Sequence, residues 1–259
     1  MTILDELATY AKERVQKAQA VKSLEELREQ ALALPKGDLP FSKALRKTEL
    51  SFICECKKAS PSKGIIATSF PYLEIAKQYE KAGADCISVL TEPKWFLGSD
   101  AYLQAISSNV QLPCLRKDFV VDEYMLYEAK LLGAAAVLLI CTILSEAQLK
   151  KYLGICAELG LDALVEVHDE QELQLALKTG AQIIGVNNRN LKDFTVDMEN
   201  SRRLRALVPP GVLFVVESGV STVEDVRRVK AIGADAVLIG EALMRASDKI
   251  SFLRELKNA

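Results

Sequence analysis

Gly233-Ala234-Asp235-Ala236-Val237-Leu238-Ile239 is the stretch that decides the fold, because variants of it recur along the chain. Each variant starts with a glycine that can end a helix and continues directly into an apolar run typical of a buried strand. The other copies lie at residues 83–89, 133–139, 160–166 and 180–186. Their intervals fit a helix-to-strand unit of about 25 residues, with one unit skipped in the first gap and one in the last.

Filling these gaps gives eight candidate strands, at residues 51–57, 86–91, 113–117, 136–141, 163–167, 183–187, 213–217 and 236–240. Helical patterns follow them, near residues 71–82, 100–109, 122–132, 145–159, 170–179, 198–207, 222–232 and 247–257. Eight strand–helix units in about 210 residues predict an α/β fold of the (β/α)8 TIM barrel type. A doubly wound open sheet is the alternative. It would usually carry fewer strands and a glycine-rich first turn, which Ser60-Pro61-Ser62-Lys63-Gly64 is not.

The residues before the first strand form a helical leader. Apolar side chains recur at helical spacing over residues 2–20, a capping box opens a second helix at 24–34, and residues 40–45 suit one more turn. This leader has too little apolar surface to fold alone. We therefore expect residues 1–49 to form an N-terminal helical extension packed on a barrel of residues 50–259, with one domain overall.

Charge and hydropathy exclude several classes of partner. The chain carries 33 basic and 35 acidic residues, and no basic stripe suggests nucleic-acid binding. The longest apolar run, Ala134 to Cys141, is far shorter than the roughly 18 residues of a membrane span. The acidic start of the chain lacks the features of a secretory signal. We therefore expect a cytoplasmic protein without nucleic-acid or membrane partners.

Cysteine and histidine usage argues against disulfides and against metal. The six cysteines lie mostly in apolar runs, where a free thiol behaves as a small buried side chain. The chain has one histidine, His168, and no C-x-x-C pair, so a metal site would have almost no ligands to draw on. We expect no metal site.

The first predicted strand places Glu55 and Lys57 on one face and Cys54 and Cys56 on the other. In isolation, this pattern is also typical of an edge strand whose charged face meets water. The repeated strand–helix units favour a different interpretation. In a barrel, the ends of the strands and the loops that follow them build the functional site, so this face would point into the barrel mouth.

Lys117 and Glu166 are the strongest candidate acid and base, because alternation sends both side chains into the mouth from neighbouring sectors. A lysine that is partly desolvated and next to Lys57 would lose its proton more readily, and a buried glutamate would hold its proton more tightly. Both pKa shifts would favour general acid and base catalysis near neutral pH. The alternative is that each lysine pairs with a glutamate in a structural ion network. His168 is interpreted as a loop residue at the start of the next helix rather than as a catalyst.

The ends of the seventh and eighth strands resemble a phosphate site. Barrels of this kind often bind phosphate with the loops after these strands. Here the loops contain Ser218-Gly219 and Gly240-Glu241, whose backbone N–H groups could bind an anion if the Glu241 carboxylate points away. Either glycine could instead be an ordinary turn residue. Asn187 and Arg189, after the sixth strand, could hold a substrate hydroxyl or carboxylate, or could tie down their own loop.

Six motifs at these strand ends carry a resemblance to a known family. They are Glu-x-Lys-x-x-Ser-Pro-Ser (55–62), Leu-Thr-Glu-x-x-Trp-Phe-x-Gly (90–98), Arg-Lys-Asp-Phe (116–119), Leu-Val-Glu-Val-His (164–168), Asn-x-Arg-Asn-Leu (187–191) and Glu-Ser-Gly-Val (217–220). In this order, and with the helical leader, the chain closely resembles indole-3-glycerol phosphate synthase over essentially its whole length.

The resemblance implies a reaction and a set of roles. The family converts 1-(2-carboxyphenylamino)-1-deoxyribulose 5-phosphate to indole-3-glycerol phosphate with loss of CO2 and water, in tryptophan synthesis, without cofactor or metal. By resemblance, Lys117 would be the general acid, Glu166 the general base for dehydration, and Lys57 the anchor of the substrate carboxylate. The resemblance also implies that Glu55 and Asn187 orient these groups, that Ser218, Gly219, Gly240 and Glu241 take the phosphate, and that Phe96, Phe119 and Leu138 form an apolar wall. We expect Ser60, Arg189 and Glu217 to bind substrate as well.

Two other functions fit parts of this pattern. The sugar-phosphate isomerase of the preceding step is also a phosphate-binding barrel, but the Glu55, Lys57 and Lys117 set favours the synthase. A non-catalytic phosphometabolite-binding barrel would be expected to lack Lys57, Lys117 or Glu166, and all three are present. Because the sequence shows no fused isomerase, we expect a monofunctional enzyme, a monomer or weak homodimer, that acts on a phosphorylated small molecule.

Overall fold

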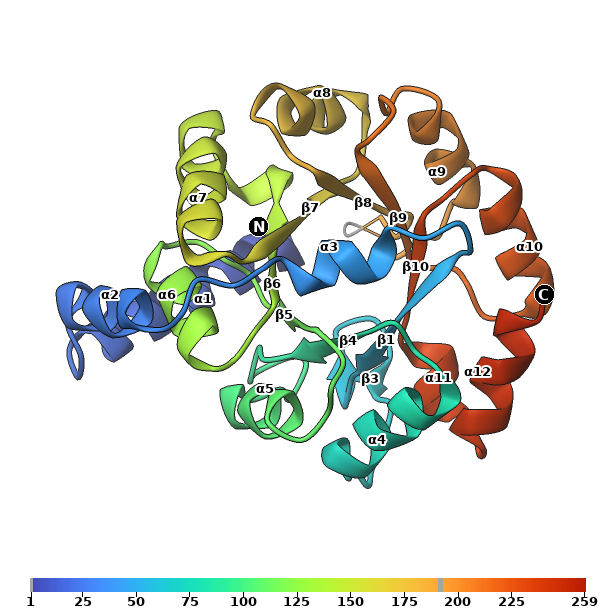
Figure 1. The fold of residues 1–259 in the computed structure, drawn as a ribbon, viewed down its shortest axis with the longest axis horizontal. Coiled ribbons are helices and arrows are strands. Elements are labelled where there is room, and N and C mark those ends of the chain that lie inside the picture. The colour runs from blue at the N-terminus through green and yellow to red at the C-terminus, as the bar shows by residue number, and fades with distance from the viewer. Residues whose placement is uncertain (1, 191–192) are drawn as a thin grey trace.

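A computed structural model of the chain describes residues 2–190 and 193–259. Within these ranges, eight parallel strands close into a barrel surrounded by helices, a TIM barrel (Figure 1). The strands are β1 (Ser51–Cys56), β4 (Cys86–Leu90), β5 (Cys114–Lys117), β6 (Ala136–Ile140), β7 (Asp162–Val167), β8 (Ile183–Asn187), β9 (Leu213–Glu217) and β10 (Ala236–Ile239). The surrounding helices are α4 (Tyr72–Ala82), α5 (Asp100–Ser107), α6 (Tyr124–Leu131), α7 (Glu146–Leu159), α8 (Glu170–Lys178), α9 (Met198–Arg205), α10 (Val223–Ala231) and α12 (Lys249–Lys257).

Closure of the barrel depends on β1, which pairs in parallel with β4 on one side and with β10 on the other. The predicted TIM barrel is confirmed, and the open sheet is excluded. The edge-strand interpretation of β1 is also excluded, because a strand paired on both sides has no free edge. All six residues of β1 are buried, including Glu55.

The recurring sequence motif that runs from a glycine into a strand has a clear structural basis. Gly83 and Gly160 adopt left-handed backbone conformations, with φ of 91° and 68°, and cap the C-termini of α4 and α7. In two of the copies, the aspartate at the third position then accepts a hydrogen bond from the preceding strand. Asp85 accepts a 2.8 Å hydrogen bond from the N–H of Phe52, and Asp235 accepts one of 2.7 Å from the N–H of Phe214. The motif therefore both ends a helix and fixes the start of the next strand.

The leader forms α1 (Ile3–Gln19), α2 (Leu24–Ala33) and α3 (Pro40–Leu45), as the sequence predicts. α1 buries Leu4 and Leu7, and α2 lies beside α6 (Figure 1). α3 lies over the end of the barrel where the strands begin, because the N–H of Ser42 donates a 2.8 Å hydrogen bond to Asp162 at the start of β7. The leader therefore contributes buried side chains to the same apolar core as the barrel.

Three short elements were not predicted: the hairpin of β2 (Ala59–Ser60) with β3 (Gly64–Ile65), the 3-10 turn η1 (Cys141–Ile143), and α11 (Glu241–Arg245). Each is too short to leave a periodic pattern in the sequence. In the described ranges, no helix is both long enough and apolar enough to span a membrane.

Candidate active site

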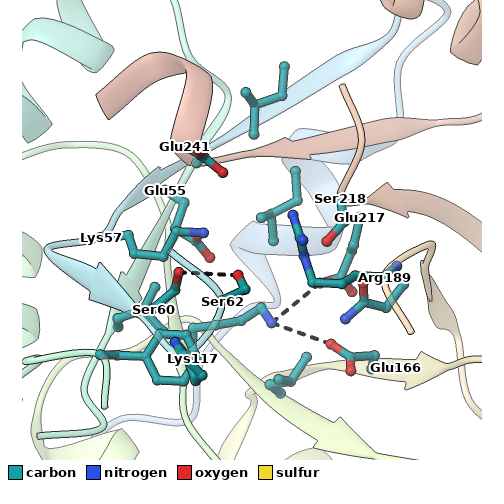
Figure 2. A pocket seen from close by; sticks show the side chains of 18 of the residues that line it. Glu55, Lys57, Ser60, Ser62, Lys117, Glu166, Arg189, Glu217, Ser218 and Glu241 are labelled. Atoms are coloured by element: carbon teal, nitrogen blue, oxygen red, sulfur yellow. Dashed lines mark hydrogen bonds and ion pairs between the residues drawn. The ribbon is translucent and has the colours of Figure 1, made fainter. Parts of the chain in front are cut away.

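A cavity of about 450 Å³ opens where the strands run into their loops (Figure 2). The residues predicted for the site lie along this one cavity. They are Glu55, Lys57, Ser60, Phe96, Lys117, Phe119, Leu138, Glu166, Asn187, Arg189, Glu217, Ser218, Gly219, Gly240 and Glu241. The closed barrel brings them together, because the C-terminal ends of parallel strands meet at one end of the barrel.

Lys117 lies between two carboxylates. Its Nζ is 3.4 Å from Oε2 of Glu166 and 3.4 Å from Oε2 of Glu217 (Figure 2). The side chain of Lys117 is 15% exposed, and those of Glu166 and Glu217 are 3% and 2% exposed. Such buried charges must be compensated by partners. The lysine therefore partly neutralises the two acids that face the cavity.

The predicted pKa shift of Lys117 is wrong in direction. Burial alone would lower its pKa, but the carboxylates of Glu217, Glu166 and Glu55 outweigh burial and raise the pKa above its usual value. The nearby Lys57 does not reverse this, because its Nζ forms a 2.6 Å ion pair with Glu55. Lys117 is therefore held as a cation at neutral pH.

Glu217 is the carboxyl group that holds its proton near neutral pH. Burial raises its pKa to about 7, and repulsion from Glu166 acts in the same direction, against the attraction of Lys117. Its Oε1 atom makes no hydrogen bond to any described residue. Gly185 on β8 leaves room for this carboxyl, because a Cβ there would lie 2.1 Å from Oε1. The sequence did not single out Glu217 for a raised pKa, because that expectation was made for Glu166.

Glu55 shows the opposite behaviour. Burial would raise its pKa, but Lys57 and Lys117 outweigh burial, and its pKa is lowered. Gly240, at the end of β10, packs directly on the Glu55–Lys57 pair, since a Cβ there would lie 2.3 Å from Oε1 of Glu55 and 3.0 Å from Nζ of Lys57. The expected phosphate loop and the acid–base pair of β1 are therefore in direct contact.

The loop after β9 turns sharply through two successive residues with positive φ. Ser218 and Gly219 have positive φ values of 64° and 93°, and a Cβ on Gly219 would lie 2.6 Å from Sδ of Met198. The carboxylate of Glu241 is engaged by Arg245, whose Nε lies 3.0 Å from Oε1.

The apolar side of the cavity is formed by aromatic rings. The ring centroids of Phe96 and Phe119 are 5.9 Å apart. Phe96 is held by Glu92, a buried carboxylate that accepts hydrogen bonds of 2.9, 2.8 and 2.9 Å from the N–H groups of Lys94, Trp95 and Phe96. The loop that carries the predicted wall is therefore fixed by a side chain that does not itself line the cavity.

Comparison with known proteins identifies the family. The family model of indole-3-glycerol phosphate synthase matches residues 4–256. The chain belongs to the indole-3-glycerol phosphate synthase family. An indole-3-glycerol phosphate synthase of Ruminiclostridium cellulolyticum is 52% identical over 258 residues, with 99% of this chain and 99% of that protein covered. One of Lacticaseibacillus paracasei is 49% identical over 256 residues, with 98% of each chain covered.

Solved structures of lower identity support the fold alone. KGPDC from Streptococcus mutans superposes with a TM-score of 0.64 at 13% identity, covering 82% of this chain and 97% of that one. A thiamine phosphate pyrophosphorylase from Pyrococcus furiosus superposes with a TM-score of 0.63 at 17% identity, covering 83% of this chain and 96% of that one.

Two side chains of this synthase-family motif hold the loop after β8. Oδ1 of Asn187 accepts a 3.0 Å hydrogen bond from the N–H of Arg189, whose Nη1 donates to the carbonyl of Phe194 at 3.2 Å. Both side chains thus tie down their own loop, although both also line the cavity. Leu191, the last residue of the motif, lies outside the described residues.

Several residues near the synthase-family site were not predicted. Ile3 and Leu7 of α1 line the cavity, so the leader covers part of the mouth. Asn188 is buried, and its amide donates a 3.2 Å hydrogen bond to the carbonyl of Ser218, which fixes the turn after β9. Helical spacing predicted that Ile3 and Leu7 would be buried, but it could not show where. Nothing in the sequence distinguished Asn188 from its neighbours.

His168 lies closer to the predicted base than the sequence suggested. Its Nε2 is 3.4 Å from Oε1 of Glu166, and Glu172 lies on its other side. Over residues 2–190 and 193–259, no group of three or more histidine, cysteine, aspartate or glutamate side chains is arranged to hold a metal ion. The six cysteines are buried free thiols.

Proposed function

We propose that this protein converts 1-(2-carboxyphenylamino)-1-deoxyribulose 5-phosphate to indole-3-glycerol phosphate, with release of CO2 and water, as a carboxy-lyase of tryptophan biosynthesis. Membership of the indole-3-glycerol phosphate synthase family supports this activity. The single structural observation that carries it is the position of Lys117, a cation between Glu166 and Glu217 at the base of a cavity with an apolar wall.

The substrate is anchored at two ends in this proposal. The turn at Ser218 and Gly219, together with Gly240 and Glu241, takes the phosphate through backbone N–H groups. Lys57 takes the carboxylate, and Glu55, 2.6 Å away, holds Lys57 in place. Ring closure requires the aromatic carbon to be pressed against the carbonyl carbon, and two anchors convert binding energy into that orientation.

Lys117 acts first on the carbonyl group. As the aromatic carbon that bears the carboxylate bonds to the carbonyl carbon, the carbonyl oxygen gains negative charge and takes a proton from the Lys117 ammonium group. The raised pKa of Lys117 keeps the ammonium group charged before the reaction begins but makes it a weaker acid, so it acts mainly through its positive charge. A buried cation at the position where charge develops stabilises the transition state more than it would in water.

Glu166 acts in the dehydration step. Loss of the carboxylate as CO2 restores the aromatic ring, and the new hydroxyl group then takes a proton from Lys57 and leaves as water. Glu166 accepts the proton that the ring carbon next to nitrogen gives up, so that the double bond of the indole forms. Phe96, Phe119 and Leu138 hold the aromatic ring, Asn187 orients the hydroxyl groups, and Ser60, Arg189 and Glu217 complete the contacts to substrate.

A direct assay tests this activity. The purified protein is mixed with the synthetic carboxyphenylamino substrate in EDTA, and formation of indoleglycerol is followed by fluorescence. We expect turnover at an undiminished rate in the chelator. Absence of product, or a requirement for added metal, would contradict the proposal.

We further propose that residues 1–49 and the barrel of residues 50–259 form one domain, in a cytoplasmic monomer or weak homodimer without nucleic-acid or membrane partners. The shared apolar core of the leader and barrel supports the first part, and the balanced charge supports the last. Size-exclusion chromatography over a range of protein concentrations tests the oligomeric state, and a stable tetramer would contradict it.

A further inference from the structure

The imidazole ring of His168 lies between two carboxylates. On one side, its Nε2 is 3.4 Å from Oε1 of Glu166. On the other, its Nδ1 is 3.1 Å from Oε2 of Glu172, on α8. Nε2 is buried and makes no hydrogen bond among the described residues, so its main polar neighbour is the Glu166 carboxylate.

The surroundings fix the tautomer of this ring. Oγ1 of Thr142 donates its proton to Oε1 of Glu172 at 2.6 Å, so it can only accept at Nδ1, 3.3 Å away. Both neighbours of Nδ1 are therefore acceptors, and Nδ1 carries a proton. Nε2 then either carries the second proton and faces Glu166 as a donor, or presents a lone pair to that carboxylate, which is unfavourable while Glu166 is ionised.

The backbone of His168 is held in place by two hydrogen bonds that do not involve its imidazole ring. The N–H of His168 donates to Oε2 of Glu172 at 2.8 Å, and its carbonyl accepts a 2.9 Å hydrogen bond from the amide of Asn200 on α9. A change of side chain at this position would leave both bonds available. The position is therefore suited to a substitution that tests the imidazole alone.

We propose that His168 is a positioning residue for the dehydration step: its imidazolium, held from behind by Glu172 and Thr142, keeps the carboxylate of Glu166 aimed into the cavity until Glu166 accepts the substrate proton. This inference rests on the proposed role of Glu166 as general base. It gives His168 a part in the reaction without contact with substrate, because His168 does not line the cavity.

The charged groups around His168 favour its protonated form. They are the carboxylates of Glu166 on β7, Glu172 on α8 and Glu217 on β9, while Lys117 on β5, the cation on the far side of Glu166, acts against them. Burial would lower the pKa of His168, but Glu172, Glu166 and Glu217 outweigh burial and raise it above its usual value. The pKa of Glu172 is lowered, although burial opposes this, because of the hydrogen bonds from His168 and Thr142. Glu172 therefore stays ionised behind the histidine.

A titration that does not depend on catalysis tests the contact. His168 is the one histidine in the sequence, so the imidazole signal in an NMR pH titration needs no assignment. We expect its pKa to fall by at least about half a unit in Glu166→Gln and in Glu172→Gln, and to be unchanged in Glu146→Gln, an exposed control on α7. An unchanged pKa in Glu166→Gln would overturn the proposal.

Kinetics of two variants test the consequence. In His168→Ala, we expect kcat to fall about tenfold with little change in KM, and the alkaline limb of the kcat profile to move. In His168→Gln, whose amide can donate to Glu166 but cannot titrate, we expect most of kcat to return without the wild-type limb. A wild-type pH profile and kcat in His168→Ala would overturn the proposal.

The two experiments separate this inference from the proposed function. If the wild-type protein forms no indoleglycerol, the proposed function fails, and the dehydration role of His168 fails with it, whatever the NMR result. If the wild type is active and the His168 pKa does not respond to Glu166→Gln, the positioning role alone fails. Thermal unfolding of each variant identifies a loss of kcat that is caused by misfolding. If His168→Ala misfolds, the kcat and pH profile of His168→Gln test the positioning role.

Discussion

The guanidinium group of Arg14 on α1 donates two hydrogen bonds to the carboxylate of Asp118, at 3.1 and 2.6 Å. Asp118 directly follows Lys117 and is fully buried, and it also accepts a 2.6 Å hydrogen bond from Thr91. Arg14 therefore connects the leader to the strand end that carries the proposed general acid.

Replacing Arg14 with leucine should destabilise the protein by about 3 kcal/mol, because Asp118 would lose its bidentate partner while buried. We also expect kcat to fall, since the end of β5 would lose its tie to α1. Urea unfolding and steady-state kinetics measure the two effects. Lys17→Ala, at an exposed position of the same helix, is the control, and equal stability of the two variants would contradict the structural role of Arg14.

Lys117→Ala and Glu166→Gln should each lower kcat by at least about 100-fold without unfolding the protein, because each removes a proton-transfer group. Turnover and circular dichroism measure the outcome. The exposed ion pair of Lys178 with Glu146, 2.8 Å apart, supplies matched controls in Lys178→Ala and Glu146→Gln. Near-normal turnover in Lys117→Ala or Glu166→Gln would remove that residue from its proposed role.

Glu217 should make stability depend on pH. Its pKa is raised to about 7 in the folded protein, so it binds a proton that the unfolded chain has released. The resulting stabilisation is complete below the unfolded pKa and is lost as the pH rises through about 7. Compared with Glu217→Gln, the wild type should lose up to about 1.4 kcal/mol of unfolding free energy per pH unit in this window. Urea unfolding across this pH range measures the difference. If the unfolding free energies of the wild type and Glu217→Gln changed in parallel with pH, the raised pKa of Glu217 would be contradicted.

Gly219→Ala should weaken phosphate binding, because the residue has a φ of 93° and a Cβ there would meet Met198 and Val196. We expect the KM for substrate, and the inhibition constant of inorganic phosphate, to rise about tenfold. Gly154→Ala is the control: its Cβ would meet no atom within 4 Å, and in the helix interior it should stabilise by about 0.5–1 kcal/mol. A parallel rise in KM in both variants would contradict the phosphate role.

The sequence determined the strands and where its polar residues would meet. Alternation in Ser51–Cys56 and in the other strands fixed which side chains share a face, and the glycine-to-strand motif fixed the order of helix and strand. In a closed parallel barrel, those two facts are enough to bring Glu55, Lys117 and Glu166 to one cavity. This part was predictable because it depends on local periodicity and on a topology that the repeats reveal.

Only the tertiary structure decided how these groups interact. The sequence placed Lys117 beside Lys57 and predicted a lowered pKa, whereas the structure places it between Glu166 and Glu217, where its pKa is raised. The structure also placed His168 against Glu166. A pKa depends on distances of a few ångströms between side chains far apart in the sequence. Periodicity gives the face on which a residue lies, but not which partner it meets there.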